Sequence, residues 1–218
     1  MSEDAFTSCE KAVRAHDPDR FFAVLFAPEA VRPHLFALAA LHYEIAHAAS
    51  APREPMLKAI RLTWWRETIE RARDGKPREH AVAQALAETL QAYALPPALF
   101  DTLIDARMGE APDSDAAAQA YADATVGSLM RLMAHVTGGE VELSDAAIAY
   151  GLAGRKFAGV DASGLARQHH QQARHAYPRA LLPVVLPAAL VPLYLGNPDP
   201  PLWRKQIAYL GAALRGRI

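Results

Sequence analysis

The chain of 218 residues has only one cysteine, Cys9, which excludes a disulfide within the chain. A reducing compartment fits this single thiol. The first residues, MSEDAFTSCEK, are polar and acidic and lack the apolar core of a signal peptide. We therefore expect a cytoplasmic location.

Lys plus Arg number 23 and Asp plus Glu 24, a net charge of 23 − 24 = −1. Without a long basic run, nucleic acid is not an expected partner.

Long hydrophobic runs are also scarce. The one uncharged apolar stretch, ALLPVVLPAALVPLYL at 180–195, is shorter than the ~20 residues that a membrane-spanning helix needs. Pro183, Pro187 and Pro192 interrupt it. The stretch predicts a buried, kinked helix. Peripheral contact with a membrane surface, such as the inner membrane, is the alternative left open.

Several motifs of site chemistry are missing. There is no glycine-rich phosphate loop and no Gly-x-Ser-x-Gly elbow. Among nine histidines, His42 and His47 are five residues apart and do not share a helix face well. His169, His170 and His175 have no Cys or Glu at ligand spacing. We therefore expect solvated surface histidines, no metal site and no cofactor.

Nearly every long segment has the helical period, and no segment alternates as a strand does. No linker or repeat divides the chain, so we expect one domain over residues 1–218. The sequence predicts an all-α fold of about nine or ten helices, enough to enclose a central cavity. Asp17-Pro18 predicts a helix start, with a capping side chain followed by proline in the first turn, before the short apolar helix 21–26. The further expected helices are 29–50, 56–73, 79–93, 98–109, 115–137, 145–154, 163–177, the proline-rich stretch and the final 201–218.

The segment MLKAIRLTWWRETIE, residues 56–70, carries two adjacent tryptophans. Trp64 and Trp65 lie about 100° apart on a helix, so they cannot share one narrow seam. The apolar residues form two lines, Leu57–Ile60–Trp64 and Leu62–Trp65–Ile69. Such a broad apolar arc predicts a helix embedded among several others.

A second segment, YADATVGSLMRLMAHVTG at 121–138, places Thr125, Gly127 and Ser128 inside a predicted helix. Small residues there permit close contact between helices or leave room for a ligand, and the sequence leaves both readings open.

Four stretches in this order resemble the squalene/phytoene synthase family: DPDRFFAVLFAPEAVRPHLFALAALHYEIA, EPMLKAIRLTWWRETIE, YADATVGSLMRLMAHVTG and PPLWRKQIAYLGAALRGRI. The similarity covers nearly the whole chain. It is greatest to the divergent branch that includes a mitochondrial complex I assembly factor and its bacterial relatives. It implies an isoprenoid-synthase bundle around a long apolar cavity. It also implies, for active members, head-to-head condensation of two prenyl diphosphates with Mg²⁺ held by two aspartate clusters.

The chain departs from the family at both aspartate clusters. The register of the resemblance places the first two aspartates at Ala46 and Ser50, and the preceding arginine at Tyr43. Glu44 is the only acid in that stretch and lies on a different face from Ala46. At the second cluster the chain reads GLAGRKFAGVDASG, with the single acid Asp161. The chain also looks shorter than the family norm near 154–160 and 195–200.

Without paired carboxylates, we expect no catalytic residues and no bound metal. The resemblance implies substrate-binding positions at Tyr121, Thr125, Gly127, Glu44 and Arg66. We favour a non-catalytic, assembly-factor-like protein that binds a prenyl lipid, a prenyl diphosphate or a protein partner. The alternatives are a Mg²⁺-dependent prenyl transferase of the squalene/phytoene type, and a helical interaction module with a filled core.

Overall fold

The structure is a computed structural model that describes residues 2–51, 54–139 and 141–218. Its first half consists of helices α1 (Ser2–His16), α2 (Pro18–Val24), η1 (Glu29–Val31), α3 (Arg32–Ser50), α4 (Pro55–Arg73), α5 (Ala81–Ala92) and α6 (Pro97–Met108). Asp17 caps α2 by accepting a hydrogen bond from the backbone N–H of Arg20, with proline in the first turn. The Asp-Pro start predicted from the sequence is therefore confirmed.

The second half continues with α7 (Asp115–Ala122), the π-helical turn η2 (Asp123–Gly127), α8 (Ser128–Thr137), α9 (Ser144–Leu152), α10 (Ala162–Gln172), η3 (Arg179–Leu181), α11 (Leu182–Val185), η4 (Leu186–Leu190), α12 (Val191–Gly196) and α13 (Leu202–Arg215). Within the described ranges there is no β-strand, only an isolated antiparallel bridge between Ala176 and Arg217. The all-α class predicted from helical periodicity is confirmed.

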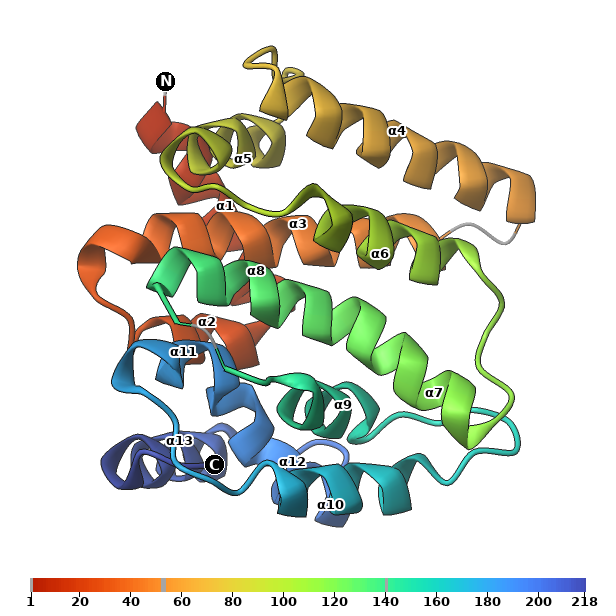
Figure 1. The fold of residues 1–218 in the computed structure, drawn as a ribbon, viewed down its shortest axis with the longest axis vertical. Helices are drawn as coiled ribbons and strands as arrows, with labels where there is room; N and C mark the ends of the chain where they lie inside the picture. The colour runs from red at the N-terminus through yellow and green to blue at the C-terminus, as the bar shows by residue number, and fades with distance from the viewer. Residues whose placement is uncertain (1, 52–53, 140) are drawn as a thin grey trace.

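Helix α3 lies at the centre of the bundle. It packs against α1, α4, α5, α6 and α8, and every residue from Leu35 to His42 is buried. Helices α4 and α5 cover one end of the molecule, whereas α10, α12 and α13 form the opposite end (Figure 1). The core therefore runs along α3.

The proline-rich stretch confirms the buried, kinked prediction. It forms η3, α11, η4 and α12, and a proline stands in the first turn of each of the last three. The segment 179–196 is long and apolar enough to cross a membrane by composition, yet more than half of it is buried in the fold. Its hydrophobicity is therefore used largely in the protein core.

Two features of the fold differ from the sequence predictions. The first is α1, which was not among the predicted helices, although Ala5, Cys9 and Val13 recur every four residues and are all buried. The second is α4, which is an outer helix (Figure 1). Its buried line is Leu62–Trp65–Ile69. In the other line Leu57 and Ile60 are 40% and 58% exposed, and Trp64 is half-buried against the core. The prediction of a fully embedded tryptophan helix is wrong because only one of its two apolar lines is fully buried.

Candidate functional site

A cleft of about 270 Å³ lies where α2, α3, α6, α9 and α12 converge. Its lining is rich in arginine and tyrosine, with small apolar residues between them. The lining residues are Asp17, Arg20, His42, Tyr43, Ala46, Arg107, Val126, Tyr150, Gly151, Ala153, Arg155 and Tyr194. Residues from six helical elements, with η2 the sixth, and from the loops before α2 and after α9 therefore meet at one point, although they are up to 177 positions apart, from Asp17 to Tyr194.

Arg20 forms one side of the cleft and is already paired. Its guanidinium donates to the carboxylate of Asp17, three residues earlier and across the start of α2. It also lies over the ring of Tyr150, 5.4 Å from the ring centroid. Two partners thus fix a buried cation in one orientation, which is the condition under which a buried charge is tolerated.

Arg107 forms the opposite side, and its charge is not neutralised. The residue is only 7% exposed, yet no carboxylate of the described residues lies within ion-pair distance of it. Its Nε has no hydrogen-bond partner, and its Nη2 lies 3.3 Å from Nε2 of His42. Burial lowers the pKa of Arg107, and the positive charges of Arg155 and Arg20 lower it further. A buried guanidinium of this kind is expected to have an anionic partner.

His42 orients Arg107 without adding charge. Burial lowers the pKa of His42 well below its usual range, and the nearby Arg20, Arg107 and Arg155 lower it further. The ring is therefore neutral near pH 7. A neutral ring accepts the hydrogen bond from Arg107 at Nε2 and carries its proton on Nδ1.

Behind the cleft, Asp19 is the centre of a buried polar network. Its carboxylate accepts hydrogen bonds from the hydroxyls of Tyr150, at 3.1 Å, and Tyr194. Lys205, from α13, donates to the same carboxylate at 2.9 Å and to the Tyr194 hydroxyl at 2.7 Å. Tyr209 donates to the Asp19 backbone carbonyl at 2.9 Å. Asp19 is thus fully satisfied within the protein.

The cleft and its network carry an excess of positive charge. Arg20, Arg107, Arg155 and Lys205 supply four cations, and Asp17 and Asp19 two anions, so the sum is 4 − 2 = +2. Arg155 is exposed, and no described carboxylate pairs with it either. The two arginines without a carboxylate come from α6 and from the loop after α9. Together they give the cleft two guanidinium groups without a carboxylate partner among the described residues.

The positions of the missing first aspartate cluster lie only partly at this cleft. Tyr43 and Ala46 line it, whereas Ser50 is exposed near the end of α3, with its hydroxyl 3.5 Å from the carbonyl of His47. Glu44 faces a different groove, between α3 and α4, beside Arg61 and Trp64. Arg66 lies on the outer surface and pairs with Asp101 and Asp105 of α6. The structure therefore does not bring Glu44 or Arg66 together with the arginine cleft.

The segment 121–127 supports the cleft from behind. The ring of Tyr121 lies under the guanidinium of Arg107, 5.9 Å away. The hydroxyl of Thr125 donates to the carbonyl of Tyr121 at 2.7 Å within the π-helical turn. A Cβ at Gly127 would come within 2.5 Å of Asp123 and 2.7 Å of Arg131. The glycine thus leaves room for the ion pair between those two side chains, rather than for a ligand.

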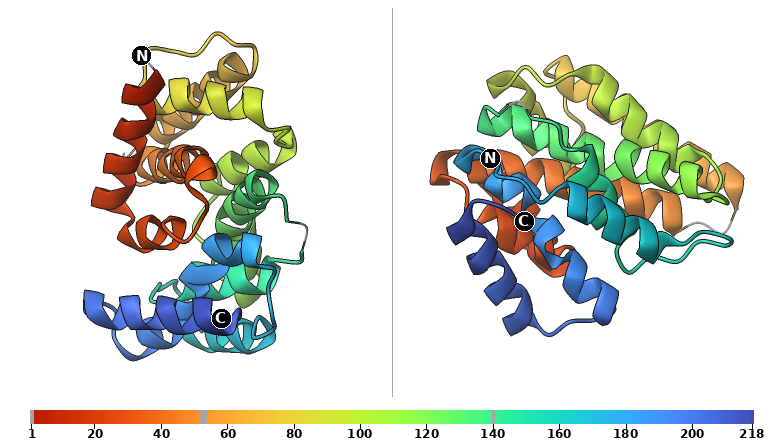
Figure 2. Two further views of the ribbon diagram at one scale, coloured as in Figure 1. Left: turned by 90° about the vertical axis from the view of Figure 1, so that its left-hand side faces the viewer. Right: turned by 60° about the horizontal axis from the view of Figure 1, so that its bottom comes forward.

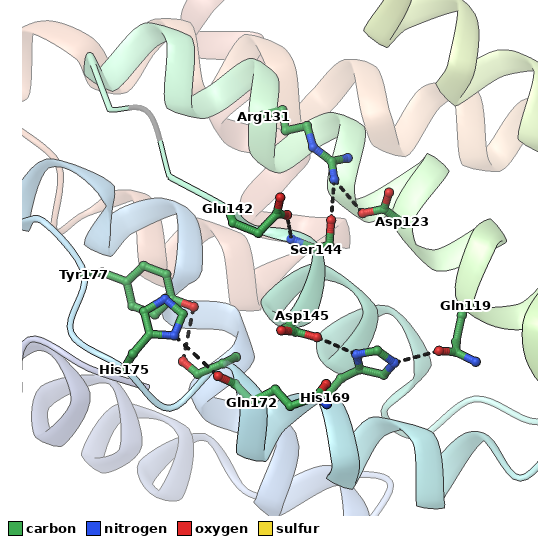
Figure 3. A network of polar contacts seen from close by, with 11 residues as sticks. Gln119, Asp123, Arg131, Glu142, Ser144, Asp145, His169, Gln172, His175 and Tyr177 are labelled. Carbon is green, nitrogen blue, oxygen red and sulfur yellow. Dashed lines mark hydrogen bonds and ion pairs between the residues drawn. The ribbon is translucent and has the colours of Figure 1, made fainter.

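A polar network further along the same helices appears in Figure 3. Arg131 donates to Asp123 and to Ser144, each at 2.7 Å, and joins α8 to the start of α9. His169 lies between Asp145, at 2.7 Å, and Gln119, at 2.8 Å, and links α10 to α9 and α7. These contacts hold the helices that carry the cleft.

The expectation that the histidines are solvated is wrong for two of them. His42 and His169 are 5% and 9% exposed. Both are buried because each meets hydrogen-bonding partners from distant helices, which no spacing in the sequence reveals.

The magnesium clusters of active family members do not fit the residues at this cleft. The resemblance assigns the first aspartate to the position of Ala46, and the one acidic side chain in the lining, Asp17, is bound to Arg20. In the part of the chain that the structure describes, no group of three or more His, Cys, Asp or Glu could hold a metal ion. The cleft is instead lined by the guanidinium groups of Arg20, Arg107 and Arg155.

Comparison with known proteins places the chain in a family. The sequence profile of the squalene/phytoene synthase family matches residues 13–154, more than half of the chain. The chain therefore belongs to the squalene/phytoene synthase family, which confirms the resemblance drawn from the sequence. No curated protein matches the sequence significantly.

Two solved structures share the fold. A dehydrosqualene synthase in complex with a ligand superposes with a TM-score of 0.64 at 13% identity, covering 99% of this chain and 84% of that one. The squalene synthase HpnC from Alicyclobacillus acidocaldarius also superposes with a TM-score of 0.64, at 18% identity, covering 98% of this chain and 92% of that one. At these identities the likeness establishes the fold.

The sequence predictions did not include Arg20, Arg107 or Arg155. One signal for Arg107 was present. In PALFDTLIDARM it follows Phe100, Leu103 and Ile104 at helical spacing, so it stands on the apolar face of α6. An arginine in an apolar stripe indicates a buried charge that requires a partner.

Proposed function

We propose that this protein is a non-catalytic member of the family that binds the phosphate or diphosphate group of a prenyl lipid, without a metal ion. The observation that carries the proposal is that the guanidinium of Arg107 is buried and forms no ion pair with a carboxylate of the described residues. Phosphate oxygens accept paired hydrogen bonds from guanidinium groups, and a diphosphate matches the +2 charge of the cleft region.

The prenyl part of the ligand is inferred from the family. Ala46, Val126 and Ala153 give the cleft small apolar surfaces beside its arginines. An amphipathic ligand with an anionic head and a hydrocarbon tail suits this mixture. The volume of about 270 Å³ is below the ~300–1,000 Å³ of typical small-molecule sites, so it fits a head group with the first part of a chain.

The same observations speak against the alternative, condensation of two prenyl diphosphates with Mg²⁺. That reaction needs space for two prenyl chains and carboxylates that hold the cations of the leaving group. The cleft is small, and its one lining acid is engaged by Arg20. Arginines alone stabilise a bound diphosphate but do not assemble a metal cluster.

An assembly-factor-like role would follow from binding without turnover. The resemblance to the branch with a complex I assembly factor supports it, as does the exposed line on α4. Ile60, at 58% exposure, borders the groove that Arg61 and Trp64 also line. In this role the bound lipid would stabilise the fold while a partner protein occupies the α3–α4 groove.

The proposal is tested by calorimetric titration of farnesyl diphosphate into the full chain in EDTA. We expect binding in EDTA, and Arg107→Met weakening it by about 10- to 150-fold, the equivalent of one charged hydrogen bond of ~1.5–3 kcal/mol. Arg66→Gln is the matched control, because Arg66 is an arginine outside the cleft. Farnesol, which lacks the diphosphate, should bind far more weakly. Binding that requires Mg²⁺, or that Arg107→Met leaves unchanged, would refute the proposal.

A further inference from the structure

The outer face of α13 is apolar although nothing in the structure covers it. Trp203, Ile207, Leu210 and Leu214 recur at spacings of four, three and four residues, so they form one ridge along the helix. They are 58%, 62%, 55% and 88% exposed, whereas Tyr209, on the inner side, is buried. Figure 2 shows α13 at the outer edge of the molecule in both views.

The apolar surface continues beyond the helix. Leu25 and Phe26, at the end of α2, are 39% and 40% exposed and border a groove with Tyr209 and Leu210. The groove has a volume of about 370 Å³. Single exposed apolar residues are common, but a ridge with an adjoining apolar groove indicates an interaction surface.

On the other flank of α13 the surface is basic. A groove of about 860 Å³ between α10, α12 and α13 is lined by Arg167, Arg174, Arg215 and Arg217. No acidic side chain lines this groove, and none of the four arginines forms an ion pair within the described ranges. Four unpaired guanidinium groups therefore lie beside the apolar ridge.

The net charge is divided unequally between the C-terminal region and the rest of the chain. Residues 162–218 contain seven Lys and Arg and one Asp, a net charge of 7 − 1 = +6. The chain as a whole is −1, so residues 1–161 carry −1 − 6 = −7. The near-neutral total conceals a basic C-terminal region that carries the exposed apolar ridge.

We propose that this surface docks on an anionic lipid bilayer, with the α13 ridge inserted among the head groups and the arginine groove binding lipid phosphates. An interfacial helix has this composition, with an apolar face, tryptophan and flanking cations. A second copy of the chain is a poor occupant, because self-association would bring two +6 regions together. The segment 179–196 stays in the core, so the protein lies on the bilayer rather than crossing it.

Docking through α13 would also place the cleft close to the lipid. Lys205 is on the inner side of the same helix and donates to Asp19 and Tyr194 behind the cleft. One helix thus faces the bilayer with its outer side and holds the cleft network with its inner side.

The test is co-sedimentation of the full chain with vesicles of phosphatidylcholine alone, or of phosphatidylcholine with an equal part of phosphatidylglycerol. We expect binding to the anionic vesicles, little binding to the neutral ones, and a loss as salt rises. Ile207→Glu combined with Leu214→Glu should reduce the partition coefficient more than tenfold. Arg167→Gln combined with Arg174→Gln should reduce it about fivefold per arginine.

Matched controls separate this surface from general stickiness. Met56→Glu changes an apolar residue on α4 that is 76% exposed, and Arg71→Gln changes an exposed arginine at the far end of the molecule. Both should bind anionic vesicles as the unaltered chain does, and circular dichroism should show all variants folded. Failure of the folded, unaltered chain to bind anionic vesicles would overturn the proposal. So would full binding by the Ile207→Glu, Leu214→Glu variant.

Discussion

Replacing Arg107 by methionine should stabilise the free protein and weaken the liganded one. A lone ion in a protein interior costs several kcal/mol in lost hydration, and Arg107 is 7% exposed with no described carboxylate to compensate it. Methionine is of similar length and carries no charge. The substitution also removes the hydrogen bond to His42, which is worth about 1 kcal/mol. We expect a net gain of about 1 kcal/mol, or about 2–4 °C in melting temperature.

Inorganic diphosphate should make the unaltered chain more stable than the Arg107→Met variant. At a concentration of about 100 times its Kd, it would stabilise the unaltered chain by about 2.7 kcal/mol. If Arg107→Met weakens binding about 30-fold, the same concentration would stabilise the variant by only about 0.9 kcal/mol. The two melting temperatures should therefore cross when diphosphate is added in EDTA.

The assay is thermal unfolding followed by circular dichroism, with and without diphosphate. Arg66→Met is the control. The exposed ion pairs of Arg66 contribute at most about 1 kcal/mol to stability. Diphosphate should raise the melting temperature of Arg66→Met as much as that of the unaltered chain. A contradicting result would be an Arg107→Met variant that melts several degrees below the unaltered chain without ligand, and whose melting temperature diphosphate raises as much as that of the unaltered chain. Arg107 would then be a structural residue.

Three further predictions concern the cleft and the core. The folded protein lowers the pKa of His42, so only the unfolded chain binds this proton as the pH falls below about 6.5. The free energy of unfolding should then fall by up to ~1.4 kcal/mol per pH unit. His42→Gln should remove this contribution to the pH dependence, as measured from urea unfolding curves. Asp19→Asn leaves the partly buried Lys205 without its carboxylate and should cost about 3–5 kcal/mol in the same assay, part of which Lys205→Met should recover. Burial and the charge of Glu44 raise the pKa of Cys9 to about 12, so a thiol reagent near pH ~8 should label it only after unfolding.

Each of these has a contradicting result. If His42→Gln leaves the loss of stability in acid unchanged, that loss comes from other groups, such as His34 and His170, whose pKa values burial also lowers. An Asp19→Asn variant as stable as the unaltered chain would show that water solvates Lys205. Rapid labelling of Cys9 in the folded protein would show that α1 detaches from the core.

Periodicity was sufficient to predict the fold class, because most helices here have an apolar stripe and a clear start or stop. Asp17-Pro18 and the three prolines of segment 180–195 mark boundaries that the structure confirms. Periodicity could not tell which apolar line of α4 meets the core. Leu62 and Ile60 look alike in the sequence, yet only Leu62 is buried, since burial depends on the neighbouring helices.

The candidate site was harder to predict, because its residues come together only in the fold. Arg20, Arg107 and Arg155 lie on α2, on α6 and after α9, and no spacing rule connects them. The resemblance predicted missing aspartates on α3, and two of the positions that it assigns, Tyr43 and Ala46, line the cleft. It gave no sign of the arginines that line the same cleft.

The most direct test of the account is diphosphate release from farnesyl and geranylgeranyl diphosphate by the full chain, with Mg²⁺ and with EDTA, alongside a binding titration in the same buffers. The account predicts binding in both buffers and release no greater than background in either. Release that depends on Mg²⁺ and exceeds background would contradict it, and would show that the protein catalyses cleavage of prenyl diphosphates despite Ala46 and Ser50 at the positions that the resemblance assigns to aspartates.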